Sequence, residues 1–334
     1  MANDSSESSN SPEIPPIPIA IVEAASNGRL VLFVGAGVSR LASGPSWEMA
    51  ANNAFEDLIE KGLIPFCEAE QLRGEHPKKK LSIAMDISKG ADFILDFRRI
   101  FTPGEYQPHA QIYRNLYSIG VPIVTTNYDE GLDHEAQQRT PVATPVQAVE
   151  SRAPQVSGIQ EKPRGVVYCH KNDLTIEKLL QPGAVIHIHG SVQDHTSMVV
   201  STRQYLEHYR DPFIQTFLQK LFEGNYTVLF VGYGLEEEEI IEYVTLKNPG
   251  KLQCALQEEK HFWLYPRLAY QEARFRHLSQ YYLNHYNVKL VPYSIDRLGH
   301  SQLKGVITEW TGQLRTNARA PDFLDKVRLI DEVT

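Results

Sequence analysis

The sequence is poor in cysteine, and its three cysteines are far apart. Cys67, Cys169 and Cys254 form no C-x-x-C pair, which excludes a four-thiolate zinc site. This usage indicates reduced thiols and a cytoplasmic protein. Cys169 is followed by His170, but two neighbouring ligands are too few to close a tetrahedral metal site. The sequence therefore predicts no metal.

Long apolar runs and an excess of basic residues are also missing. No run approaches the ~18 apolar residues that cross a bilayer, so we expect no membrane contact. The first 20 residues are polar and acidic, and they predict a disordered tail over residues 1–18 rather than a secretory signal. The net charge of −8 argues against direct nucleic-acid binding. The basic run from His76 to Lys80 could contact a partner or form a solvated helix end.

Two kinds of apolar spacing alternate along the 334 residues. Short aliphatic and β-branched runs predict buried strands at 30–34, 121–124, 166–168, 185–188, 226–231, 261–264 and 288–291. Apolar residues three and four apart predict helices at 47–61, 81–89, 91–101, 109–117, 203–222, 236–244 and 301–314. This alternation predicts an α/β fold, with a mainly parallel sheet covered by helices on both faces.

Two segments interrupt this rhythm. Short helices predict a helical insert at about residues 63–104, and a loop-rich insert is expected at about 140–180. The main domain is expected to span residues 19–300, followed by a C-terminal helix and tail at 301–334. Four glutamates at 236–239 lie in the first turn of their predicted helix, where the helix dipole favours them.

The first predicted strand runs into a glycine turn, in the sequence LVLFVGAGVSR. Gly35 and Gly37 allow the backbone to turn sharply and to approach a phosphate at the start of the next helix. The common dinucleotide-binding pattern G-x-G-x-x-G would require glycine where this chain has Arg40. The turn alone is compatible with nucleotide binding or with a plain connection.

Three further strands end in small or polar residues, at Thr125–Asp129, at His189-Gly190 and at Gly232–Gly234. Each end has a structural alternative: the Asn and Asp could cap a helix, and the His could be a core residue. In a parallel sheet, however, the carboxyl ends of all these strands lie along one edge, where ligands bind. The four ends together therefore predict one site.

With these segments in order, the chain resembles the Sir2-like family. The matching sequences are GAGVS (35–39), TTNYD (125–129), HIHG (187–190), STRQYLEHYRD (201–211), VGYGLEEEEI (231–240) and VKLVPY (288–293). The resemblance covers roughly residues 28–296. It implies a Rossmann-like sheet with a small inserted helical module, and NAD bound between the two.

The resemblance also implies roles for individual residues. Asn127 would position a ribose and a water, Asp129 would face the nicotinamide carboxamide, and His189 would be the catalytic histidine. His187 is the weaker candidate, because only His189 lies at the strand end. The implied NAD-binding residues are Gly35, Ala36, Gly37, Ser39, Thr126, Gly232, Tyr233, Gly234 and Tyr293. Cleavage of the nicotinamide–ribose bond suits this set, since a neutral histidine can take a proton and an asparagine can hold water.

The missing cysteine pairs separate this chain from the protein-deacylating sirtuins, which carry a structural zinc module. Within the zinc-free bacterial branch, the resemblance implies an NAD hydrolase that depletes NAD in anti-phage defence, as in abortive infection. We expect control by homo-oligomer assembly or by a partner such as a DNA-translocating ATPase or a short Argonaute. A protein deacylase, an ADP-ribosyltransferase and a non-catalytic NAD or ADP-ribose sensor remain alternatives.

Overall fold

The computed structural model describes residues 12–138, 165–181, 183–234 and 260–318. Several sequence predictions lie outside this range: the tail up to residue 11, most of the loop-rich insert, the helix at 236–244 and the C-terminal tail beyond residue 318. No helix among the described residues is both long and apolar enough to cross a membrane.

Seven strands of the described residues form one sheet, and every neighbouring pair is parallel. They are β1 (Leu30–Val34), β2 (Ile123–Thr125), β3 (Val167–Tyr168), β4 (Val185–His187), β5 (Thr227–Val231), β6 (His261–Arg267) and β7 (Val288–Ser294). Their order is β3-β4-β2-β1-β5-β6-β7. The chain builds one side of the sheet from β1 and then returns to build the other. The carboxyl ends of β1 and β5 therefore flank a topological switch point.

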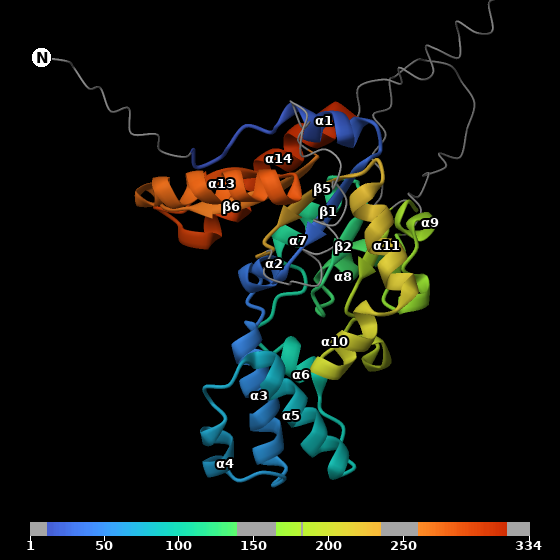
Figure 1. The fold of residues 1–334 in the computed structure, drawn as a ribbon, viewed down its shortest axis with the longest axis vertical. Helices are drawn as coiled ribbons and strands as arrows, with labels where there is room; N and C mark the ends of the chain where they lie inside the picture. The colour runs from blue at the N-terminus through green and yellow to red at the C-terminus, as the bar shows by residue number, and fades with distance from the viewer. Residues whose placement is uncertain (1–11, 139–164, 182, 235–259, 319–334) are drawn as a thin grey trace, which may run out of the picture.

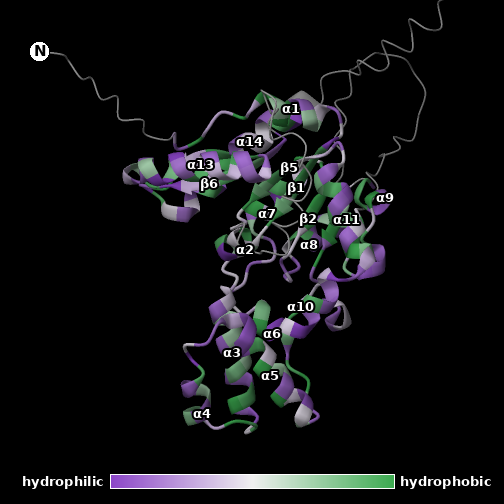
Figure 2. Cartoon of the chain, in the orientation of Figure 1, coloured by the Kyte–Doolittle hydropathy of each residue, from purple (hydrophilic) through white to green (hydrophobic). Residues whose placement is uncertain are grey.

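Apolar clusters cover both faces of the sheet, because successive side chains of a strand point to opposite faces. On β1, Leu30, Leu32 and Val34 belong to one cluster, whereas Val31 and Phe33 belong to the other. Figure 2 shows the central strands coloured as hydrophobic. The sheet and its two covered faces confirm the predicted α/β, Rossmann-like fold.

Helices from distant parts of the chain supply the outer layers (Figure 1). One face is covered by α1 (Ile19–Ser26), α7 (Gln111–Ser118), α8 (Gly131–Gln137) and α14 (Gln302–Ala318). The other face is covered by α9 (Ile176–Leu179), α10 (Thr202–Tyr209), α11 (Pro212–Glu223) and α13 (Glu272–Tyr286). The short α2 (Ala36–Leu41) follows β1 directly.

A helical module lies between β1 and β2 in the sequence and projects from the sheet in Figure 1. It contains α3 (Trp47–Glu60), α4 (Phe66–Gln71), α5 (Pro77–Gly90) and α6 (Phe97–Phe101). These helices share a third apolar cluster, so the structure adds α3 to the helices of the expected insert. The cluster also includes residues from the loops after β2 and β4, namely Tyr128, Val192, Met198 and Val200.

Three local features differ from the sequence predictions. Helix α6 begins at Phe97 rather than at residue 91, because Asp92 has φ +53° and the Asp96 side chain caps the helix at Arg99 N, 3.0 Å away. Helices α1 and α13 were not predicted. Residues 12–18 are not a free tail where described, since Trp310 Nε1 donates to Pro15 O at 2.8 Å.

Candidate active site

The carboxyl ends of β1, β2 and β5 open into a cleft of about 670 Å³. This volume lies within the ~300–1,000 Å³ of small-molecule sites. The strand ends contribute Ala36, Gly37, Ser39, Thr126, Asn127, Asp129, Gly232, Tyr233 and Gly234, all of them predicted site residues. The helical module contributes Trp47, His76, Lys78 and Phe101 to the lining. The cleft therefore lies at the switch point, where open α/β sheets bind ligands.

The backbone turn after β1 contacts the turn after β5. Gly37 N donates to Gly232 O at 2.7 Å. A Cβ on Gly37 would lie 2.7 Å from that oxygen, and a Cβ on Gly35 would lie 2.6 Å from the Cα of Tyr233. Gly232 has φ +61°, in the left-handed region that favours glycine. A larger residue would therefore separate the two turns that form this part of the cleft.

Asn127 follows β2, and only the nitrogen of its side-chain amide is hydrogen-bonded by the described residues. Its Nδ2 donates to Gly35 O at 3.1 Å, and its backbone N donates to Thr125 Oγ1 at 3.0 Å. Its Oδ1 is buried and accepts no hydrogen bond from the described residues. Buried amide oxygens are nearly always paired in folded proteins. Asn127 thus lines the cleft and carries an acceptor that the described residues leave unsatisfied.

Asp129 is surrounded by hydroxyl donors. Its Oδ1 accepts from Tyr106 Oη at 2.5 Å, from Tyr113 Oη at 2.9 Å and from Gly131 N at 3.1 Å. Its Oδ2 accepts from the Ser39 hydroxyl. Burial, and then the charge of Asp129, raises the pKa of both tyrosines, so they remain neutral donors. Oδ2 accepts from one described residue and can accept a second hydrogen bond from a molecule in the cleft.

His189 lies behind the wall of the cleft rather than in it. The side chain is fully buried, with Nε2 2.7 Å from Tyr209 Oη and Nδ1 3.4 Å from Tyr205 Oη. Tyr205 itself lines the cleft. Burial, and then the nearby His208, lowers the pKa of His189 well below its ordinary value. The imidazole is therefore neutral at pH 7.

His187 uses both ring nitrogens inside the protein. Nε2 is 2.7 Å from Asp133 Oδ1, and Nδ1 is 2.8 Å from Asn127 O. Both side chains of the His187–Asp133 pair are fully buried. Burial lowers the pKa of His187, but the charge and hydrogen bond of Asp133 outweigh burial and raise it. His187 is thus a positioning residue that holds the backbone of Asn127.

Positive side chains border the cleft. Arg40 lines it from α2, and Lys78 lines it from α5. Lys78 Nζ lies 3.9 Å from the centroid of the Tyr205 ring. Cationic groups that converge on a cleft favour an anionic ligand such as a phosphate.

The structure does not bring every predicted residue to the cleft. Tyr293 is 2% exposed and belongs to the apolar cluster under α14. Gly35 lies next to the lining residues and is buried. Two residues around Asp129, Tyr106 and Tyr113, were not expected. The helical spacing of 109–117 could have placed Tyr113 on a buried face, but no motif in the sequence indicates either hydroxyl.

Comparison with known proteins matches residues 121–291 to the family model described as SIR2-like domain. The curated protein Defense-associated sirtuin 2 of Bacillus subtilis is 24% identical over 227 residues, which cover 66% of this chain and 19% of that protein. The chain thus spans about a fifth of the length of this relative. The family model matches slightly more than half of the 334 residues. The chain belongs to the SIR2-like domain family.

Proposed function

We propose that this chain hydrolyses NAD⁺ to nicotinamide and ADP-ribose. The observation that carries the proposal is the unpaired, buried Oδ1 of Asn127 in a cleft that Asp129 also lines. The close contact between Gly37 and Gly232 brings two glycine turns to the cleft at the switch point, where open α/β sheets bind ligands. Membership of the SIR2-like family supports NAD as the substrate.

The lining residues suit the diphosphate of NAD⁺ and its nicotinamide and ribose groups. The side chains of Arg40 and Lys78 would attract the diphosphate. Asp129 Oδ2 would accept from the carboxamide N–H of nicotinamide, while Ser39 holds the carboxylate in place. Asn127 Oδ1 would accept from a ribose hydroxyl or from the attacking water.

In the proposed reaction the bond between nicotinamide and ribose breaks through an oxocarbenium-like transition state. Nicotinamide leaves with the bonding electron pair, water adds to the ribose carbon, and one proton is released. His189 is the proposed base for that proton, because its imidazole is neutral at pH 7. Tyr205 contacts His189 and lines the cleft, whereas His189 does not line it, so the proposal requires a side-chain movement that brings His189 to the proton.

Nicotinamide release from NAD⁺ by the purified chain tests the proposal. We expect His189→Ala to lower kcat by at least about 100-fold, and Asn127→Ala by about 100-fold, through lost proton transfer and lost positioning. Arg40→Gln should raise KM about tenfold and leave kcat nearly unchanged. Unchanged turnover in both the His189 and Asn127 variants would refute the site.

Matched control variants separate these effects from general damage. Asn225 is exposed and precedes β5, at the opposite edge of the sheet from the cleft, and His300 is exposed near α14. Asn225→Ala and His300→Ala should retain wild-type turnover. Free ADP-ribose is the expected product. ADP-ribose attached to a peptide would instead indicate a transferase, and tight NAD binding without turnover would indicate a sensor.

The name of the B. subtilis relative supports a place in defence, and we extend the proposal to NAD depletion during phage infection. Such an activity requires restraint in the uninfected cell. We therefore propose activation by self-assembly or by a partner protein such as a DNA-translocating ATPase or a short Argonaute. Full turnover by the isolated monomer, unaltered by any such partner, would contradict this control.

A further inference from the structure

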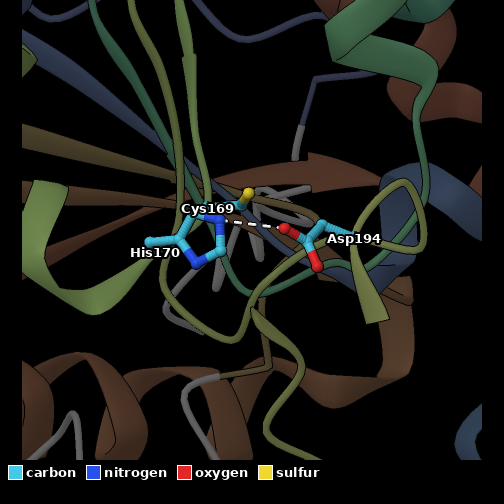
Figure 3. Close-up of side chains that lie close together, drawn as sticks. All are labelled: Cys169, His170 and Asp194. Atoms are coloured by element: carbon cyan, nitrogen blue, oxygen red, sulfur yellow. Dashed lines mark ion pairs between the residues drawn. The ribbon is translucent and has the colours of Figure 1, made fainter. Parts of the chain in front are cut away.

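A second group of reactive side chains lies away from the cleft. Cys169 and His170 follow β3, and Asp194 lies in the loop between β4 and α10. One ligand atom from each residue lies within 4.8 Å of the other two. Figure 3 shows His170 and Asp194 facing each other, with the Cys169 sulfur beside the histidine ring. His170 Nε2 is 2.9 Å from Asp194 Oδ2.

These three residues supply sulfur, nitrogen and oxygen, a donor set that suits Zn²⁺. Ligand atoms of a tetrahedral zinc site are about 3.4–3.6 Å apart, given bond lengths of about 2.0–2.3 Å. The ligand atoms lie within 4.8 Å of one another, so a bound ion would draw them to this spacing, and the His170 side chain is 49% exposed and can move. Asp194 supplies the third ligand that cysteine and histidine spacing alone did not indicate.

The neighbouring lysines do not neutralise this group. Lys171 Nζ pairs with Asp211 at 2.8 Å, and Lys178 pairs with Asp173. Asp194 Oδ1 accepts from Thr196 N and Thr196 Oγ1, which leaves Oδ2 facing His170. A cation here would meet one carboxylate, one imidazole and one sulfur, with the fourth tetrahedral position open to water.

The three residues also connect the end of β3 with the loop that follows β4 and carries His189. The loop that carries Asp194 follows β4 and includes His189 and Gly190, and a Cβ on Gly190 would lie 2.3 Å from Ser197 O. Ser197 Oγ donates to Asp194 O at 2.7 Å and accepts from Ser191 N at 3.1 Å. An ion at this position would fasten the end of β3 to the loop that follows His189. None of its three ligands lines the cleft.

We propose that Cys169, His170 and Asp194 bind one Zn²⁺ ion with a water as the fourth ligand. Binding replaces the thiol proton of Cys169, which passes to the solvent, by a zinc–sulfur bond. The ion stabilises the β3 end and the loop after His189. The proposal does not depend on NAD hydrolysis.

Titration of the chelator-treated, tag-free full chain with Co²⁺ tests this site. A thiolate–cobalt charge-transfer band should saturate at about one equivalent, and Zn²⁺ should abolish it. The band should be absent in Cys169→Ser and retained in Cys67→Ser, a control at an exposed cysteine on α4. Asp194→Asn and His170→Ala should each weaken Co²⁺ binding by at least about tenfold.

A second measurement guards against variants that fold poorly. Circular dichroism in the presence of chelator compares each variant with the wild type, and Zn²⁺ should raise the Tm of the wild type and of Cys67→Ser only. A folded wild-type chain without a thiolate band would overturn the proposal. So would an undiminished band in Cys169→Ser, or equal Zn²⁺-induced changes in Tm for all variants.

Discussion

The buried pair of His187 and Asp133 can be perturbed in two graded ways. Both side chains are 0% exposed, and His187 Nε2 lies 2.7 Å from Asp133 Oδ1. Asp133→Ala removes the anion and leaves the Nε2 donor without an acceptor. Removing one partner of a buried pair costs about 3–5 kcal/mol. At roughly 2 °C per kcal/mol for a chain of this size, the Tm should fall by roughly 6–10 °C.

Asp133→Asn should destabilise the fold less, because a carboxamide has nearly the shape of the carboxylate and can donate to Nε2 of a neutral His187. The remaining Nδ1–H would still donate to Asn127 O, which lies 2.8 Å away. The variant should therefore lose less stability than Asp133→Ala.

The stability of the wild type and that of Asp133→Asn should also respond differently to pH. Asp133 raises the folded-state pKa of His187, so the pair contributes full stability below the unfolded value of about 6.5. This contribution is lost as the pH rises through the folded-state pKa. The free energy of unfolding should therefore decline above about pH 6.5 in the wild type but not in Asp133→Asn.

Urea unfolding followed by tryptophan fluorescence, from about pH 6.5 upward, measures both effects. Glu207→Ala is the control, since Glu207 forms a solvent-exposed pair with Arg203 that water and salt screen. Equal pH dependence in the wild type and Asp133→Asn would refute the role of the charged pair. A loss in Asp133→Ala no larger than that of the control would refute the argument from burial.

Three further substitutions test the turn, the carboxylate and the core. Gly37→Ala places a Cβ 2.7 Å from Gly232 O, so it should lower the free energy of unfolding by about 1–3 kcal/mol and weaken NAD binding. Calorimetry that finds the stability and the NAD affinity unchanged would contradict the close contact. Tyr113→Phe removes a 2.9 Å hydrogen bond to Asp129 and should cost about 1.5–3 kcal/mol in urea unfolding, and a loss near zero would count against that bond. Trp310→Ala should cost about 3–5 kcal/mol because the indole is 1% exposed; a smaller loss by thermal unfolding would show that the site collapses.

The sequence predicts the sheet because apolar runs mark its strands. It also predicts the positions of three of the four strand ends, because parallel strands end at the same edge of a sheet. Apolar runs such as Leu30–Val34 are buried on both faces, and parallel strands end at one edge. That edge brings Asn127, Asp129 and Gly232 together. His189 differs because β4 ends two residues earlier, and the following residue, Gly190, adopts φ +81°. The backbone after a strand has no fixed period, so its side-chain direction could not be predicted.

Tertiary packing decides the remaining features. Tyr113 reaches Asp129 because α7 packs beside α2 and α8, and Tyr106 reaches it from the loop before α7, contacts that spacing along the chain does not specify. Helix α13 has no fully buried residue, and its weak apolar pattern did not indicate a helix. Metal-ligand spacing was likewise read along the sequence, whereas Asp194 approaches Cys169 through folding alone.

The shared apolar cluster of the helical module limits how this chain can be altered by evolution or by engineering. Tyr128 lies between Asn127 and Asp129, and it packs in that cluster with residues of α3, α5 and α6. The module is therefore not an interchangeable cassette, because excising it would expose the side chain that separates the two polar residues of the cleft. Exchange of the module between related proteins should succeed only when the loops after β2 and β4 are transferred with it.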